Sequence, residues 1–258
     1  MKRPHYEALA ESNRSYWWFI VRYRFVWRLI QSSGTLSDKD LLADIGCGAG
    51  GFLWWLRQEC KVDSSSLFGV EKDDLSVEKA RRSGATIIQS NIESLDSIQI
   101  PEPASVITML DVLEHLENPG DALYLIRKKI RKDGRLIILV PAFQALWSDW
   151  DVSLGHHRRY SRKSLTAELT NSGWKVQKTQ YLYCALSLPA LIRAKISSNA
   201  FSQEQEFPKV PSYIDWGLRG YFGLESLLGS LLPFGTSVAA LAVPDWVVRG
   251  SGQIRAGS

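Results

Sequence analysis

A glycine-rich run near the start of the chain has the residue types and the spacing of a nucleoside-binding turn. Asp44-Ile45-Gly46-Cys47-Gly48-Ala49-Gly50 follows a short apolar segment and precedes a segment with helical periodicity. Glycines at a strand-to-helix turn let the backbone approach a ligand closely. Glu71 lies about twenty residues further on, where an acidic side chain accepts hydrogen bonds from ribose hydroxyls. The two features together predict a bound nucleoside cofactor.

The glycine spacing is compatible with two classes of cofactor. Gly46, Gly48 and Gly50 fit S-adenosylmethionine (SAM), and Gly51 stands at the third position of the dinucleotide pattern, so both patterns match. Asp44 favours SAM, because a carboxylate there repels a pyrophosphate but attracts the cationic amino-acid end of SAM. An NAD-dependent oxidoreductase and a catalytically silent SAM-binding partner subunit remain the alternatives.

A second group of reactive side chains lies at residues 155–160, in the sequence Gly-His-His-Arg-Arg-Tyr. His156 and His157 titrate near neutrality and are the predicted catalytic bases. Adjacent arginines can hold a phosphate or carboxylate in bidentate fashion. A solvated basic turn is the alternative interpretation. The residues predicted to contact the acceptor are Trp18, Arg158, Arg159 and Tyr160.

Strands and helices that alternate along the chain must position these groups. Strands are predicted at 41–45, 67–70, 86–88, 104–110, 135–140, 174–183 and 236–243. Helices are predicted at 14–30, 52–60, 75–82, 122–130 and 161–171. This order predicts an α/β fold with a doubly wound, mostly parallel seven-stranded sheet. Ligands bind such a sheet at the carboxyl ends of its strands, where both groups of reactive residues are expected.

Four segments are predicted along the chain. They are an N-terminal helical lid (1–36), a SAM-binding core (37–184), an apolar helical insertion that caps the substrate (185–235), and the last strand with the C-terminal tail (236–258). The stretch 226–244 holds no charged residue, but Pro233-Phe234-Gly235 interrupts it. We therefore expect a buried helix followed by a strand rather than a membrane span.

The composition limits the functions to be considered. The chain has 258 residues and a net charge of +4, without the dense basic stripe of a nucleic-acid binder, so no nucleic-acid partner is predicted. Its three cysteines are widely separated, no metal-ligand spacing occurs, and the N-terminus lacks the apolar core of a secretory signal. A cytoplasmic protein without a metal is expected. Trp17-Trp18-Phe19 and nearby arginines suggest either a lid over the cofactor or peripheral contact with a membrane.

Residues 41–140 resemble the class I SAM-dependent methyltransferases, especially the group that includes small-molecule and quinone-biosynthesis methyltransferases. The motifs that carry the resemblance are Leu42-Ala43-Asp44-Ile45-Gly46-Cys47-Gly48-Ala49-Gly50, Gly69-Val70-Glu71, Asp111-Val112-Leu113-Glu114-His115-Leu116 and Lys132-Asp133-Gly134-Arg135-Leu136. The family's adenine contact is usually an Asp, which Asn91 replaces here. The resemblance implies that the cofactor is bound by Asp44, Gly46, Cys47, Gly48, Gly50, Glu71, Lys72, Asn91, Ile92, Asp111, Val112 and His115.

The reaction that the resemblance implies is a direct displacement, in which sulfur, methyl carbon and nucleophile lie nearly in line. The protein mainly positions and desolvates the reactants. A base is needed only where the acceptor must lose a proton, and His156 or His157 would then serve. We therefore expect a SAM-dependent methyltransferase. The apolar insertion and the cationic loop predict a small, hydrophobic or lipid-like acceptor with a polar or anionic head.

Overall fold

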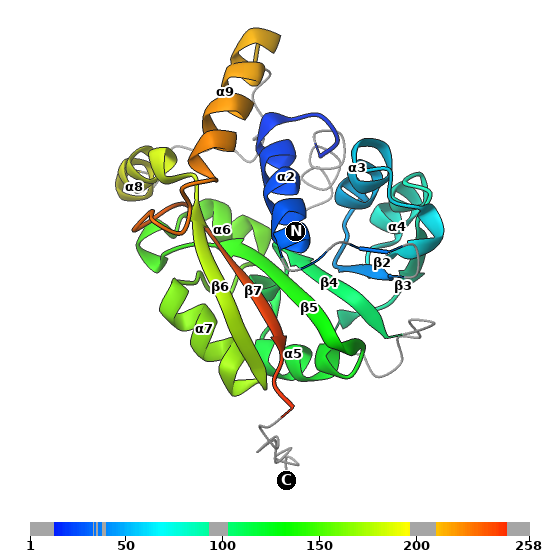
Figure 1. Cartoon of the computed structure of the whole chain (residues 1–258). Helices are drawn as coiled ribbons and strands as arrows, with labels where there is room; N and C mark the ends of the chain where they lie inside the picture. The colour runs from blue at the N-terminus through cyan, green and yellow to red at the C-terminus, as the bar shows by residue number, and fades with distance from the viewer. Residues whose placement is uncertain are drawn as a thin grey trace.

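A seven-stranded sheet forms the centre of the computed structural model, which describes residues 13–32, 34, 36–37, 40–92, 103–196 and 210–246 (Figure 1). Its strands are β1 (Leu42–Ile45), β2 (Leu67–Glu71), β3 (Thr86–Gln89), β4 (Ala104–Leu110), β5 (Ile130–Pro141), β6 (Trp174–Leu182) and β7 (Ser237–Pro244). The order is β3-β2-β1-β4-β5-β7-β6. Strands β1 to β5 pair in parallel, whereas β7 runs antiparallel to both β5 and β6. The prediction of a mostly parallel sheet is confirmed.

Helices cover both faces of the sheet, as a doubly wound fold requires. Helices α2 and α3 contribute to the buried cluster on one face, and α5 and α7 to the cluster on the other (Figure 1). The helices are α2 (Trp17–Ser32), α3 (Gly51–Glu59), α4 (Asp74–Arg81), α5 (Pro119–Arg127), α6 (Asp149–Leu154), α7 (Arg162–Asn171), α8 (Ser187–Ile196) and α9 (Ser212–Glu225). The short helices relevant to the site are η3 (Leu113–His115) and η4 (Gln144–Leu146).

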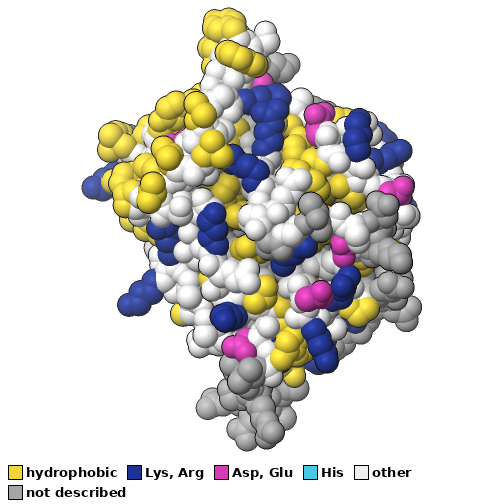
Figure 2. Space-filling view, viewed as in Figure 1, with side chains coloured by type: hydrophobic (Ala, Val, Ile, Leu, Met, Phe, Trp, Pro, Cys, Tyr) yellow, Lys and Arg dark blue, Asp and Glu magenta, His cyan; other side chains and the backbone are white. Residues whose placement is uncertain are grey.

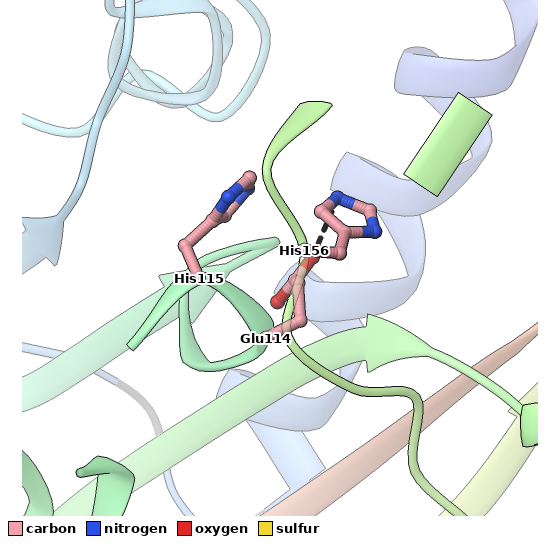
Figure 3. A group of neighbouring side chains, drawn as sticks. All are labelled: Glu114, His115 and His156. Atoms are coloured by element: carbon pink, nitrogen blue, oxygen red, sulfur yellow. Dashed lines mark ion pairs between the residues drawn. The ribbon is translucent and has the colours of Figure 1, made fainter. Parts of the chain in front are cut away.

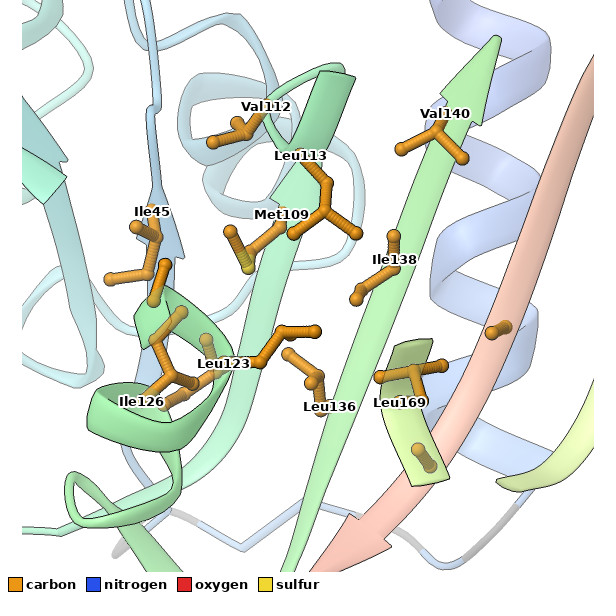
Figure 4. Packing of buried hydrophobic residues seen from close by; sticks show 14 of the residues in the cluster. Ile45, Met109, Val112, Leu113, Leu123, Ile126, Leu136, Ile138, Val140 and Leu169 are labelled. Atoms are coloured by element: carbon orange, nitrogen blue, oxygen red, sulfur yellow. The ribbon is translucent and has the colours of Figure 1, made fainter. Parts of the chain in front are cut away.

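The central strands are buried on both faces, which explains their nearly continuous apolar sequence. Every residue of β1 is buried, and β4 is buried from Ala104 to Met109. Helix-covered parallel strands read as apolar runs rather than as an alternating pattern. Figure 4 shows the packing on the α5 and α7 face, where Leu123 and Leu169 lie on either side of Leu136 of β5. Packing in this core holds the carboxyl ends of the strands in fixed positions.

The predicted boundaries around α5 and the start of β5 are wrong, because β5 begins at Ile130 rather than at residue 135. Helix α5 ends at Arg127, and Ile130 begins β5 by pairing with Ala104, so the helix predicted at 122–130 starts and ends too late. Pro119 explains the early start, because its fixed φ favours the first helical position. The sequence pattern missed this because apolar spacing continues from the helix into the strand.

The helix predicted before the last strand is also absent from the described structure. Residues 226–236 form turns and bends instead. Gly235 packs directly against the end of β6, since a Cβ atom there would be 2.2 Å from the Leu182 carbonyl oxygen. No helix among the described residues is long and apolar enough to span a membrane.

The N-terminal helix and the insertion contact each other above the sheet. The backbone N–H of Trp17 in α2 donates a hydrogen bond to Asp215 of α9 over 3.1 Å, and α9 projects away from the sheet (Figure 1). Most of α2 is packed into the core, including Phe25, Val26 and Ile30. Parts of the predicted lid, cap and tail, at 1–12, 197–209 and 247–258, lie outside the described residues. The assignment of these segments as separate units stays a prediction.

Candidate active site

A cavity of about 870 Å³ lies at the carboxyl ends of the parallel strands. The loops that follow β1, β2, β4 and β5 form one part of its wall, and residues of α2 and α8 form the other. Cavities of this size at this edge of an α/β sheet are the usual sites for cofactors and small substrates. Every predicted cofactor residue lines the cavity, with the exception of Gly50.

The three glycines of the loop after β1 have different functions. All three have positive φ angles, of 72° at Gly46, 53° at Gly48 and 74° at Gly50. A Cβ atom on Gly48 would meet nothing within 4 Å, so this peptide is open to a ligand. A Cβ atom on Gly50 would lie 2.9 Å from the Cα of Ala80. Gly50 therefore permits close packing against α4 and lies outside the cavity lining.

Glu71 holds the glycine loop in place from the end of β2. One carboxylate oxygen accepts a hydrogen bond from the N–H of Gly48 over 2.9 Å. The other accepts from the N–H groups of Lys72 and Asp73 over 2.9 and 3.0 Å. A carboxylate offers about four acceptor positions. These three bonds fix its orientation and leave capacity for a ligand hydroxyl in the cavity that Glu71 lines.

Asp44 is a buried carboxyl group at the end of β1. The Thr108 hydroxyl of β4 donates a hydrogen bond to it over 2.6 Å. Burial raises the pKa of Asp44 from 3.8 to about 7, although the Thr108 hydrogen bond opposes the shift, and the charge of Glu71 adds to it. A cationic ligand beside Asp44 would reverse the shift by favouring the ionised form.

Asp111 connects the end of β4 to helix α2. Its φ is 55°, in the left-handed region that Asp tolerates better than most residues. Its carboxylate accepts a hydrogen bond from Arg22, which is 4% exposed and therefore buried in α2. The Arg22 guanidinium also lies over the ring of Trp18, 5.7 Å from its centroid. The N-terminal helix thus reaches the cofactor side of the cavity.

His156 is held by the buried carboxylate of Asp151, which lies in the first turn of α6. Its Nδ1 lies 2.8 Å from Oδ1 of Asp151. Asp151 also accepts two hydrogen bonds from Arg159, over 2.8 and 2.9 Å, and caps α6 with Ser148. Burial opposes ionisation, but the hydrogen bonds from His156 and Arg159 lower the pKa of Asp151 to about 2. Asp151 is therefore ionised and fixes the imidazole of His156.

The structure separates the residues predicted on the acceptor side. His156, Arg159 and Trp18 line the cavity, although Arg159 is engaged by Asp151. The His157 side chain is exposed and outside the lining, and its backbone N–H donates a hydrogen bond to the carbonyl of Glu114. Two further predicted residues, Arg158 and Tyr160, also lie outside the lining and donate to the carbonyls of Glu117 and Leu113.

Several residues of the site were not predicted. Arg22 and Asp151 gave no sequence signal of their function, although Ser148 three residues before Asp151 is the pattern of a capping box. Glu114 is completely buried, and neither carboxylate oxygen accepts a hydrogen bond from another described residue. Burial raises the pKa of Glu114 well above its ordinary value, and it lowers the pKa of His115 to about 4.

The acceptor-side wall is mostly apolar and includes Leu146, Trp150, Leu154, Leu186, Pro189 and Ala190.

Comparison with known proteins identifies the class of this fold and site. Residues 22–179 match a family described as a methyltransferase domain. The match spans more than half of the chain, which therefore belongs to this family. The seven-stranded sheet places it among the class I SAM-dependent methyltransferases. The alternative of an NAD-dependent oxidoreductase has no support from this family.

Individual relatives are more distant. Over 124 residues the chain is 28% identical to the mitochondrial ubiquinone biosynthesis O-methyltransferase of Schizosaccharomyces pombe, covering 46% of this chain and 43% of that protein. It is also 30% identical over 126 residues to an uncharacterized Streptomyces fradiae protein, covering 46% of this chain and 36% of that one. The chain thus spans less than half the length of these curated relatives.

Solved structures share the fold at low sequence identity. A SAM-dependent methyltransferase from Archaeoglobus fulgidus superposes with a TM-score of 0.57 at 19% identity, covering 93% of this chain and 99% of that one. One from Thermotoga maritima gives a TM-score of 0.54 at 18% identity, covering 92% and 98%. Because both identities are low, these comparisons describe the architecture alone.

The cavity's own residues fit SAM. The open peptide at Gly48 leaves space for the cofactor, and Asp44 and Asp111 supply negative charge beside it. Glu71 retains an acceptor position for ribose hydroxyls. When bound, SAM supplies a methyl group activated by a sulfonium. Aromatic residues of α2, including Trp18, also line the cavity.

Proposed function

We propose that the chain transfers a methyl group from SAM to a lipid-like acceptor with a polar or anionic head. Helix α8 carries the proposal, because it separates the cavity from an apolar outer surface. Pro189, Ala190 and Arg193 of this helix line the cavity. Leu188 and Ile192 of the same helix are 66% and 50% exposed to solvent. An acceptor tail that follows α8 would be removed from water both inside the cavity and along the outer surface of the helix.

The outer side of α8 continues into a larger apolar surface, and we propose that this surface contacts a membrane peripherally. It includes exposed side chains of α8, α9 and the turns that follow (Figure 2). We call this set the apolar surface: Leu188, Ile192, Tyr213, Trp216, Tyr221, Leu224, Leu227, Leu228, Leu231 and Phe234. Contiguous exposed apolar side chains of this extent are typical of interaction sites.

The polar end of the acceptor would lie near His156 and the basic residues of the wall. Arg193 gives this part of the cavity positive charge, which favours an anionic or strongly polar head, while Arg159 is paired with Asp151. The Schizosaccharomyces pombe relative is named as an O-methyltransferase of ubiquinone biosynthesis. We accordingly propose a hydroxyl oxygen as the methyl acceptor, and His156 as the residue that promotes loss of its proton.

The proposal is tested with catechols that differ in the length of an isoprenoid tail. Burial of each CH₂ group contributes about 0.8 kcal/mol, so we expect kcat/KM to rise at least about tenfold when a tail of two isoprene units is added. The measurement is transfer of radiolabelled methyl from SAM. Ala190→Trp, which narrows the α8 wall, should reduce the preference for the tail. Ala194→Trp, on the same helix but outside the lining, is the matched control.

Equal kcat/KM values for tailed and tailless acceptors would contradict the proposed acceptor class. The alternative of a catalytically silent partner subunit predicts a different result. In that case calorimetry would show SAM binding, but no acceptor in the series would be methylated.

A further inference from the structure

Three side chains that could bind a metal ion meet at the wall of the cavity. Glu114 and His115 belong to η3, and His156 follows α6 (Figure 3). One ligand atom of each lies within 4.8 Å of the others. The residues are adjacent only in the fold, since some forty positions of sequence separate the two groups. This is why the sequence suggested no metal-ligand spacing.

Glu114 is a buried carboxyl group whose oxygens have no hydrogen-bond partner among the other described residues. Its side chain is 0% exposed. The closest partner, Nε2 of His156, is 3.9 Å from Oε1, which is too long for a hydrogen bond. Arg22 and Arg159 act on Glu114 electrostatically, but neither donates a hydrogen bond to it. A buried carboxylate without hydrogen bonds is costly, because it has lost its hydration.

His156 is oriented as a metal ligand rather than as a partner for Glu114 alone. Ionised Asp151 can only accept, so Nδ1 of His156 carries the hydrogen and donates it over 2.8 Å. Nε2 then presents its lone pair toward Glu114. Metal-binding histidines usually donate their other ring N–H to a carboxylate or backbone carbonyl in this way. His115 has a related arrangement, since its ring is hydrogen-bonded to the backbone of Gly155.

An ion pair between protonated His156 and Glu114 explains less of the geometry. It would satisfy at most one oxygen of Glu114, at a separation of 3.9 Å. It would also leave His115 beside a cation, with the two imidazole rings 4.7 Å apart at their centroids. A divalent cation between the three side chains satisfies the carboxylate and both imidazoles together.

We propose that Glu114, His115 and His156 bind a divalent first-row transition-metal ion. Ligand atoms around such an ion lie about 2.0–2.2 Å from it, so binding would draw the three side chains slightly closer together. Two imidazoles and one carboxylate leave further coordination positions open. These positions face the cavity, because all three ligands line it.

The function of the ion rests on the proposed methylation of a hydroxyl oxygen. A hydroxyl that coordinates a divalent ion has a lower pKa, and its proton leaves to water before the oxygen accepts the methyl group. His156 would then promote deprotonation as a ligand instead of accepting the proton itself. Metal binding can be tested without any acceptor.

The test is a Co²⁺ titration of the full chain after treatment with EDTA, followed by visible absorption and calorimetry. We expect one ion per chain with nitrogen and oxygen ligands. His156→Ala and Glu114→Gln should each weaken Co²⁺ binding at least about tenfold, since even outer-shell changes cost 10–100-fold. His157→Ala is the matched control, because this neighbouring imidazole is exposed and outside the cavity lining. SAM affinity, measured in parallel, reports that each variant is folded.

Failure to bind Co²⁺, binding that is unchanged in folded His156→Ala, or the spectrum of thiolate coordination would overturn the metal site. Turnover distinguishes this inference from the proposed function. Methylation that continues at full rate in EDTA contradicts the function of the ion. Stoichiometric Co²⁺ binding without methylation of any acceptor leaves the metal site in place and contradicts the proposed function.

Discussion

Three acidic side chains surround the cofactor end of the cavity, and each is held by a different partner. Thr108 donates to Asp44, backbone N–H groups donate to Glu71, and Arg22 pairs with Asp111. These bonds fix the carboxylates before a ligand arrives, so little reorganisation accompanies binding. The negative charge that they place together is suited to a cationic cofactor, and it is a cost to the ligand-free chain.

The cost is expected to be measurable at Asp44. Its pKa is about 7 in the folded chain against an ordinary value of 3.8, so the folded chain keeps a proton that the unfolded chain releases. Stability conferred by this group is therefore lost as pH rises from about 4 to about 7. Asn cannot ionise but can still accept the Thr108 hydrogen bond. Asp44→Asn should raise the melting temperature of the ligand-free chain, more at pH 8 than at pH 5.

The same substitution should weaken SAM binding at least about tenfold, because the attraction to the cationic amino-acid end is lost. Calorimetry measures the affinity, and thermal unfolding measures the stability. Asp121→Asn, at an exposed position of α5, is the control and should change stability by less than about 0.5 kcal/mol. A stabilisation that is equal at both pH values, or unchanged SAM affinity, would contradict the assignment of Asp44.

Eleven of the twelve residues predicted to bind the cofactor line the cavity, whereas only three of the six predicted on the acceptor side do, and the difference has a physical reason. The glycine loop and Glu71 belong to regular strand ends, so their spacing along the chain determines their positions. Residues 155–160 are irregular, and no periodicity tells which side chain faces inward. His156 is turned inward by Asp151, whereas the adjacent His157 is exposed.

At the scale of elements, α2 is both a core helix and a wall of the site. Phe25 and Val26 are buried against the sheet, and Trp17 and Trp18 line the cavity. Arg22 lies between these two regions and connects the helix to Asp111 at the end of β4. We therefore expect the position of α2 above the cavity to depend on the Arg22–Asp111 ion pair as well as on apolar packing.

Arg22→Ala should lower stability and weaken SAM binding together. Loss of one partner of a fully buried ion pair costs about 3–5 kcal/mol, and Asp111 is 38% exposed, so we expect about 1–3 kcal/mol. For a chain of this size each kcal/mol lowers the melting temperature by about 2–4 °C. The matched control is Arg24→Ala, an exposed arginine of the same helix. Equal effects of the two substitutions would show that the ion pair does not hold α2.

The order of elements followed from the sequence because apolar segments alternate with helical ones from β1 to β5. The predicted element boundaries were wrong where tertiary contacts, rather than local sequence, decide the structure. Pairing with Ala104 makes Ile130 part of a strand, although its apolar side chain also continues the pattern of α5. The segment before β7 has the composition of a buried helix. It forms turns and bends instead, and Gly235 within it packs closely against Leu182.

At the scale of the whole molecule, the cavity has a polar end and an apolar end. The strand ends supply the carboxylates, and the insertion supplies α8. The apolar surface lies on the outer side of this insertion (Figure 2). The last turn of α8 is basic and contains Arg193 and Lys195. An anionic membrane would therefore meet apolar and positively charged groups near the acceptor-side wall.

This arrangement predicts reversible binding of the chain to vesicles of anionic phospholipid, measured by flotation. Each buried Leu contributes up to about 1.5–3 kcal/mol, so Leu224→Ser with Leu231→Ser should lower vesicle binding at least about tenfold. Tyr124→Ser removes an exposed aromatic ring on α5, outside the apolar surface, and should leave binding unchanged. SAM affinity should be the same in all three proteins, because none of these residues lines the cavity. Failure of the unaltered chain to float with vesicles would contradict membrane contact. Equal flotation of the double variant would show that the contact is made elsewhere.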